Sequence, residues 1–331
     1  ISGTRDAVLM IEGFSRELPE DRMLEAISEA HRYVRELCDL QQELAGKVGV
    51  KKMDFVPPPN DGLYDRLRGS YYDRLKEAKR TEGKHARAEA VAQVKSAALL
   101  EIIPSPTAEG APALDAFSKA WHQLEEHAVR DWILSGTRPD GRDYKTLRQI
   151  VCEVDLLPCV HGSALFQRGE TQALITVALG TGRDEQRVDG LFEEYSKRFM
   201  LDYNFPSFSV GECRPIRGPG RREIGHGMLA EQSVNPVLPD HDEFPYTIRV
   251  ISDILESNGS SSMASVCGAT LGLMAAGVPI TNPGANSTYL LVKQALPSVE
   301  SIDTFGSSQQ MGIAQLAISY CDAMVEDSSL R

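Results

Sequence analysis

The apolar positions in the first 60 residues predict one short strand followed by a helix. Residues 7–11 are all apolar, which is typical of a buried strand. After Pro19, apolar residues recur every three or four positions, which is the repeat of one face of an α-helix. This helical face comprises Met23, Leu24, Ile27, Val34, Leu37 and Cys38. The prolines of residues 57–62 end the helix, because proline lacks the backbone donor that a helix interior needs.

A second helical repeat precedes a change of pattern near Gly136. The repeat is formed by Leu114, Phe117, Trp121, Leu124, Ala128 and Trp132. We expect its aromatic rings in a core rather than on a surface that stacks bases. Beyond Gly136, short apolar runs with strand-forming residues occur at 150–154, 164–166, 173–179 and 246–252. The sequence therefore predicts an α+β protein, in which an all-helical N-terminal segment precedes an α/β core.

Composition and charge narrow the classes of function. The chain has 331 residues, of which 42% are hydrophobic and 25% charged, as in a globular protein of two domains. No apolar run reaches the roughly 18 residues of a membrane span, and residues 1–6 do not begin a secretory signal. The six cysteines form no CxxC pair, which disfavours a zinc site and fits reduced thiols in the cytoplasm. A net charge of −12 argues against non-specific coating of nucleic acid, but it permits a local basic groove.

One segment of the helical region is locally basic. Residues 51–101 contain eleven Lys or Arg against eight Asp or Glu, a net charge of +3. A solvated helical face explains this excess as well as a contact with RNA does. Both interpretations stay open from the sequence.

Residues 256–264 combine the features of an anion-binding turn. They follow the predicted strand at 246–252 and lead into a helix of small residues. The start of a helix presents free backbone N–H groups and a positive dipole end, and serine hydroxyls add further donors. We therefore expect an anion site here, with Ser262 as a simple helix N-cap as the alternative.

Four arginines within nine residues form a second candidate site. Arg214, Arg217, Arg221 and Arg222 alternate with glycine and proline. Guanidinium groups bind phosphate oxygens in pairs, and glycine lets the backbone approach a ligand closely. A solvated basic loop is the alternative. His226 follows this cluster and could bind RNA or phosphate, or simply pack.

Residues 166–172 are a third candidate, and their pattern is that of a β-hairpin with a charged turn. Within it, Arg168 could reach a phosphate and Glu170 could pair with an arginine. The sequence contains no GxxxxGK[ST] loop, no HExxH and no GxSxG. Nucleotide hydrolysis on a P-loop, zinc proteolysis and serine hydrolase chemistry are therefore disfavoured.

Seven segments in the same order resemble the polynucleotide phosphorylase (polyribonucleotide nucleotidyltransferase) family. They are residues 138–143, 168–173, 180–182, 184–186, 203–206, 220–227 and 256–264. The resemblance implies that residues 1–15 are the last strand of a first core and that residues 16–135 are a helical linker domain. Residues 136–280 would be most of a second, ribonuclease PH-like (ribosomal protein S5 domain 2-like) core.

The resemblance also implies an activity and its residues. Such enzymes use inorganic phosphate to degrade single-stranded RNA from its 3′ end, release nucleoside diphosphates and work as ring-shaped homotrimers in the cytoplasm. Phosphate would be bound by Ser260, Ser261, Ser262, Arg221 and Arg222. RNA would be bound by His226, Arg168 and Arg217. The RNA-degradation machinery is a further expected partner, and no membrane is.

The family's Gly-Asp-x-Asp-Phe-Lys motif, which would supply the ligands of Mg²⁺, is missing from this sequence. The tail acids Asp303, Asp322 and Asp327 lack its spacing, and residues 311–324 predict an ordinary amphipathic helix. We therefore expect residues 281–331 to be unlike the family. Three functions stay open: an active phosphorolytic exoribonuclease, a chain that binds RNA or phosphate without catalysis, and a purely structural subunit fragment that contributes to a ring.

Overall fold

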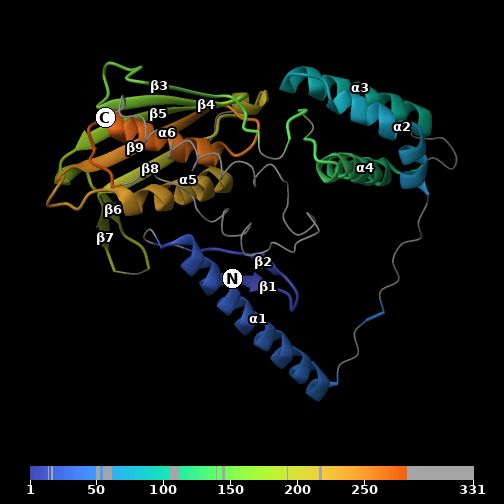
Figure 1. Cartoon of the computed structure of the whole chain (residues 1–331), viewed down its shortest axis with the longest axis horizontal. Helices are drawn as coiled ribbons and strands as arrows, with labels where there is room; N and C mark the ends of the chain where they lie inside the picture. Colours follow the sequence, from blue (N-terminus) through green and yellow to red (C-terminus); the bar gives the residue numbers. More distant parts are fainter. Residues whose placement is uncertain are drawn as a thin grey trace. The chain divides into compact units, whose positions relative to one another are not determined.

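The computed structural model describes residues 1–13, 15, 18–49, 53–54, 62–104, 112–138, 140–143, 146–191, 193–215 and 218–281. The chain divides into two compact units, one formed by Ala45–Leu147 and the other by Ile1–Leu44 together with the residues from Arg148 onward. Figure 1 shows the elements of both units coloured along the sequence. Each unit is described by itself. Helix α1 crosses the limit between them.

The N-terminal residues form a small hairpin and a long helix. Strands β1 (Ser2–Gly3) and β2 (Val8–Met10) pair antiparallel, and α1 spans Glu20–Val48. Val8 and Ile27 form a small core between the hairpin and α1. The predicted strand is therefore present, but the expectation that it is buried is wrong beyond Val8, since Leu9 is 58% exposed. Residues of the hairpin turn contact α1 as far as Asp39, yet Leu37 of the predicted apolar face is also exposed.

The second unit is a helical bundle. Its helices are α2 (Leu63–Lys79), α3 (Lys84–Ile102) and α4 (Leu114–Leu134). Leu67 and Leu75 of α2 are fully buried against Trp121 and Leu124 of α4. Phe117 stacks on Trp121, with ring centroids 6.1 Å apart. The prediction that the aromatic residues of this helix lie in the core is confirmed.

A five-stranded sheet organises the other unit, with the strand order β3-β4-β5-β9-β8. Its strands are β3 (Ile150–Val154), β4 (Gly162–Arg168), β5 (Thr171–Gly180), β8 (Phe199–Asn204) and β9 (Thr247–Glu256). All neighbours pair antiparallel except β8 and β9, which are parallel. The four strands predicted from apolar runs are confirmed. The pattern analysis missed β8, whose buried positions alternate with polar ones.

The remaining elements are short connections and two helices. A separate two-stranded ribbon is formed by β6 (Gln186–Val188) and β7 (Tyr195–Lys197). Single 3₁₀ turns span Gly182–Asp184, Ser207–Val210 and Asn235–Val237. Helix α5 covers Arg221–Val234, and α6 covers Ser261–Ala275.

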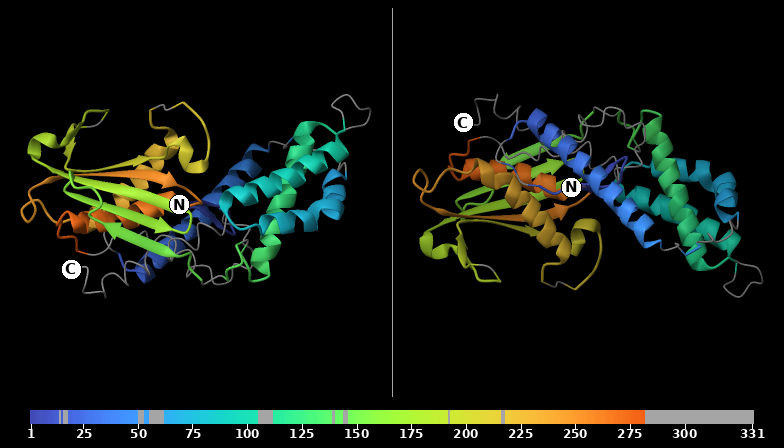
Figure 2. Two further views of the ribbon diagram at one scale, coloured as in Figure 1. Left: turned by 90° about the horizontal axis from the view of Figure 1, so that it is seen from above. Right: turned by 90° about the horizontal axis from the view of Figure 1, so that it is seen from below.

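Helices α5 and α6 lie side by side on one face of the sheet (Figure 2). Helix α6 packs on β4 and β5, while α5 packs on β8. The close approach of α6 depends on its glycines, because a Cβ added at Gly268 would lie 2.5 Å from the Ile175 side chain. The core between helices and sheet includes Ile175, Val250 and Ala264, which are fully buried. The predicted combination of helical bundle and α/β core is confirmed.

Candidate functional site

The topology of the sheet brings two of the predicted clusters to one edge. Strands β8 and β9 run parallel, so their carboxyl ends lie at the same edge. Helix α5 starts after β8 and α6 starts after β9, and the two helices are in contact. The arginines at the start of α5 and the serines at the start of α6 therefore lie at the same edge of the sheet. Open α/β sheets commonly bind ligands at this edge, where helix N-termini present their N–H groups.

The serine turn comprises residues 257–260, and Ser261 and Ser262 are the first residues of α6. Ser260 precedes the helix with left-handed backbone angles (φ 48°, ψ 48°), which are uncommon for a residue other than glycine. The side chain of Ser261 is 1% exposed and that of Ser262 is 9% exposed. The alternative that Ser262 is the N-cap is wrong, because the helix already begins at Ser261.

The buried side chain of Arg168 holds the serine turn by hydrogen bonds. Its guanidinium donates to the backbone carbonyls of Gly259 at 3.2 Å and Ser260 at 3.3 Å. The hydroxyl of Thr171 donates to the same Gly259 carbonyl at 3.2 Å and accepts from the N–H of Asn258 at 3.0 Å. The predicted hairpin is confirmed, since β4 ends at Arg168 and β5 begins at Thr171. Its side chains hold a neighbouring turn rather than forming a charged surface loop.

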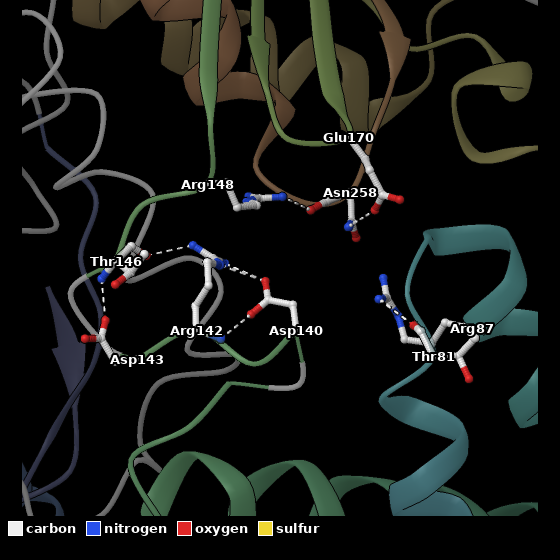
Figure 3. A network of polar contacts seen from close by, with 9 residues as sticks. All are labelled: Thr81, Arg87, Asp140, Arg142, Asp143, Thr146, Arg148, Glu170 and Asn258. Atoms are coloured by element: carbon white, nitrogen blue, oxygen red, sulfur yellow. Dashed lines mark hydrogen bonds and ion pairs between the residues drawn. The ribbon is translucent and has the colours of Figure 1, made fainter.

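Two side chains hold Asn258 from opposite sides (Figure 3). The Arg148 guanidinium donates to the Asn258 carbonyl at 3.1 Å, and the Asn258 amide donates to the Glu170 carboxylate at 2.7 Å. Sequence analysis suggested an arginine partner for Glu170, whereas the structure shows an asparagine. Six hydrogen bonds thus fix residues 258–260. Their partners are Arg148, Arg168, Glu170 and Thr171. A turn fixed in this way keeps its geometry when a ligand binds.

Three aromatic side chains in contact, those of Tyr203, Phe205 and His226, lie between Ser261 and the start of α5. The hydroxyls of Tyr203 and Ser261 are hydrogen-bonded at 2.6 Å. The Tyr203 ring stacks on Phe205, with centroids 6.2 Å apart, and meets the His226 ring edge-on at 5.3 Å. The Arg222 guanidinium lies 4.6 Å from the centre of the Phe205 ring. Tyr203 and Phe205 belong to one of the motifs of the resemblance, but sequence analysis assigned them no role.

Two of the four arginines, Arg221 and Arg222, lie on a helix, whereas Arg214 lies in the loop that sequence analysis offered as the alternative. Arg221 and Arg222 are exposed in the first turn of α5. The Glu223 carboxylate accepts from the backbone N–H groups of Gly220 at 2.6 Å and Phe205 at 3.0 Å, which fixes the start of α5 to the end of β8. Arg214 is exposed and pairs with Glu212 at 2.9 Å, and Arg217 lies outside the described residues.

The local electrostatics keep Tyr203 and His226 in their neutral forms. Burial raises the pKa of Tyr203 to about 12, against opposing contributions from Ser261 and Arg222. Burial, and then the positive charge of Arg222, lower the pKa of His226. Its Nδ1 atom is buried and has no hydrogen-bond partner among the described residues. At neutral pH the site therefore offers hydroxyl donors and a neutral imidazole beside a permanent cation.

No cluster of three metal-ligating side chains occurs among the described residues. Among them, no three His, Cys, Asp or Glu side chains converge closely enough to hold an ion. Mg²⁺ prefers a set of oxygen ligands in octahedral geometry. No metal site is therefore assigned in the described part of the chain. The acids Asp303, Asp322 and Asp327 lie outside it.

Two family models match the chain in separate stretches. The model described as "3' exoribonuclease family, domain 1" (RNase_PH) matches residues 146–279. The model described as "Polyribonucleotide nucleotidyltransferase, RNA binding domain" matches residues 62–143. The first stretch contains the five-stranded sheet with α5 and α6, and the second contains the bundle of α2, α3 and α4. The core is therefore a ribonuclease PH-like α/β domain.

Two polyribonucleotide nucleotidyltransferases are similar to most of this chain. The polyribonucleotide nucleotidyltransferase of Rhodopirellula baltica is 67% identical over 293 residues, which cover 88% of this chain and 39% of that protein. That of Syntrophotalea carbinolica is 47% identical over 314 residues, which cover 94% of this chain and 44% of that protein. Rice (Oryza sativa) Rrp46, a solved structure, is 22% identical with a TM-score of 0.36 and covers 44% of this chain and 62% of its own. The chain belongs to the polyribonucleotide nucleotidyltransferase family. It spans about two fifths of the length of these two relatives.

The prediction of where the resemblance to the family ends stays open. The 3′ exoribonuclease model ends at residue 279, whereas the alignment with the S. carbinolica protein covers 94% of the chain. The expectation that residues 281–331 are unlike the family stays a prediction, since residues 282–331 lie outside the described part. Among the described helices, none is both long and apolar enough to cross a membrane.

Proposed function

We propose that the site at the edge of the sheet binds inorganic phosphate and the 3′ end of single-stranded RNA for phosphorolysis. The observation that supports this proposal is the hydrogen bond between Tyr203 and Ser261, because the Tyr203 ring also contacts His226 and stacks on Phe205, over which Arg222 lies. Serine hydroxyls and the first N–H groups of α6 would bind phosphate. Membership of the polyribonucleotide nucleotidyltransferase family supports the choice of ligand.

In this proposal, Ser260, Ser261 and Ser262 orient one phosphate ion, and Arg221 and Arg222 offset its charge. A phosphate oxygen attacks the phosphorus of the last phosphodiester bond. The bond to the preceding 3′ oxygen breaks, that oxygen takes a proton, and a nucleoside diphosphate leaves. Positioning of the two reactants and stabilisation of charge on the phosphoryl oxygens would provide most of the rate enhancement.

RNA contacts are the second part of the proposal. His226 would lie next to the terminal nucleotide, because its ring adjoins Tyr203 at the start of α5. Arg217 stays a candidate RNA contact. Arg168 is 1% exposed and already donates to the serine turn, so we assign it to holding that turn. The model of an RNA-binding domain over residues 62–143 supports RNA as the substrate.

The wider setting follows from the family. We propose that the active form is a homotrimer in the cytoplasm, that it works with other RNA-degrading proteins, and that Mg²⁺ is its cofactor. Residues that would hold Mg²⁺ are not found in the described part, so no step is assigned to the ion.

The lack of a carboxylate cluster in the described residues favours a second candidate function for this chain. In that case it binds RNA or phosphate without turnover, since loss of a metal site removes several kcal/mol of transition-state stabilisation. One assay separates the two. The 331-residue chain is incubated with oligo(A), phosphate and Mg²⁺, and ADP is measured. Phosphate-dependent release of ADP supports the enzyme, and phosphate binding without ADP supports the binding function.

A further inference from the structure

We propose that Tyr203 is a positioning residue, which directs the hydroxyl hydrogen of Ser261 toward the phosphate bound at the start of α6. This inference deepens the proposed function and depends on it, because it assumes that the serine turn binds phosphate. Tyr203 does not touch the ligand in this account. It acts only through Ser261.

The direction of the Tyr203–Ser261 hydrogen bond follows from the acidity of the two hydroxyls. Tyr203 is 4% exposed, and its hydroxyl has one hydrogen-bond partner among the described residues, the Ser261 hydroxyl at 2.6 Å. The geometry alone lets either hydroxyl donate, but a phenol is a much stronger acid than an alcohol and therefore the better donor, so we take Tyr203 to donate and Ser261 to accept. A high phenol pKa, about 12, keeps that hydrogen in place at neutral pH.

The Ser261 hydroxyl is then left with a hydrogen of its own. A serine hydroxyl has one donor hydrogen and two acceptor lone pairs, and the bond from Tyr203 occupies one lone pair. Within the described residues, the Ser261 hydroxyl makes no other hydrogen bond. Its side chain is buried, so a donor without a partner here costs free energy unless a ligand accepts it. An anion at the first turn of α6 would be such an acceptor.

The Tyr203 ring is held firmly enough to fix its hydroxyl. Phe205 stacks on one face at an interplanar angle of 14°, and the edge of His226 meets the ring at 71°. A Cβ added at Gly227 of α5 would lie 3.4 Å from the Tyr203 Cβ, so the helix backbone also abuts the base of the side chain. The hydroxyl therefore has little freedom to turn away from Ser261.

The interpretation to exclude is that Tyr203 only fills the core. Both interpretations predict some loss of stability when the hydroxyl is removed, so stability alone cannot decide between them. They differ in phosphate binding, and in whether the effect of Tyr203 requires Ser261. A double-mutant cycle measures that dependence directly.

The test uses the 331-residue chain and its Tyr203→Phe, Ser261→Ala and double variants. The dissociation constant for inorganic phosphate is measured by calorimetry, and the melting temperature is measured without phosphate. Tyr203→Phe keeps the ring stack and removes only the hydroxyl. Tyr195→Phe is the matched control, because the Tyr195 side chain is 56% exposed on β7.

We expect Tyr203→Phe to weaken phosphate binding by about 3- to 10-fold, the worth of one hydrogen bond. In the Ser261→Ala background the same change should alter binding less than 2-fold, and Tyr195→Phe should alter nothing. Equal phosphate affinity of wild type and Tyr203→Phe, or an equal loss in both backgrounds, overturns the role of Tyr203. Absence of phosphate binding in the wild type would instead contradict the proposed function, and this inference would fail with it.

Discussion

The Tyr203 hydroxyl lies 2.6 Å from the Ser261 hydroxyl, although 58 positions of sequence separate the two residues. The bond joins the end of β8 to the first turn of α6. Because Tyr203 also packs against His226, it contacts both the first turn of α6 and helix α5.

Arg168→Met should destabilise the folded core. The change removes the donors that serve the Gly259 and Ser260 carbonyls inside the protein. Buried carbonyls that lose a partner cost about 1–3 kcal/mol in the free energy of unfolding. Urea unfolding of both proteins checks this value. Arg183→Met is the control, since Arg183 is exposed in the first 3₁₀ turn, and it should change the free energy of unfolding by less than about 0.5 kcal/mol.

Substitution by alanine should lower the stability of the protein at Gly268 of α6 and raise it at Gly225 of α5. Gly268→Ala forces a methyl to within 2.5 Å of the Ile175 side chain, and overpacking of this kind costs about 1–3 kcal/mol. Gly225 of α5 has no atom within 4 Å of an added Cβ. Gly225→Ala should therefore stabilise the protein by about 0.5–1 kcal/mol, because alanine favours the helix. Thermal unfolding of both variants measures these changes in stability. A Gly268→Ala protein as stable as the wild type would contradict the tight packing of α6 on β5.

The lowered pKa of His226 predicts a pH dependence of stability. Between the folded pKa and the ordinary value of 6.5, the unfolded chain binds more protons than the folded chain. The free energy of unfolding should therefore fall as the pH drops below 6.5, and it should level off below the folded pKa. His226→Gln should flatten this part of the curve. Melting temperatures from pH 8 to pH 5 test the effect, and identical slopes in both proteins would argue against it.

The cause of the His226 shift is testable on its own. Burial is the larger cause and the Arg222 charge the smaller one. Arg222→Met should therefore raise the His226 pKa only part of the way toward its ordinary value. An NMR titration of the imidazole protons measures the midpoint. Full recovery of the ordinary value would assign the shift to charge rather than to burial.

The sequence predicted the fold where local pattern and tertiary packing agree. The apolar runs gave four strands of the sheet, and the helical repeat from Leu114 to Trp132 gave α4 with its buried face. Strand β8 was missed although its buried residues alternate with less buried ones as in a strand, because the prediction relied on apolar runs and Asp202 interrupts the run of β8. The exposure of Leu9 depends on which elements cover the hairpin, and local pattern carries no such information.

The sequence indicated which types of residue gather near the starts of α5 and α6, but it did not indicate their contacts. Serines at a helix start and clustered arginines were recognisable from their chemistry. The burial of Arg168 under the serine turn was not, because it depends on the pairing of β5 with β9 at long range. The role of Tyr203 also needed the parallel pairing of β8 with β9, which sets its hydroxyl beside Ser261.

A phosphate titration tests the central claim, that the serine turn and the paired arginines hold one anion, most directly. Binding of inorganic phosphate to the 331-residue chain is measured by calorimetry, alongside Ser262→Ala and the double variant Arg221→Gln, Arg222→Gln. We predict saturable binding at one site, weakened at least about 10-fold by either variant, since charge-assisted hydrogen bonds contribute about 1.5–3 kcal/mol. No saturable binding, or equal binding by all three proteins, would contradict the claim.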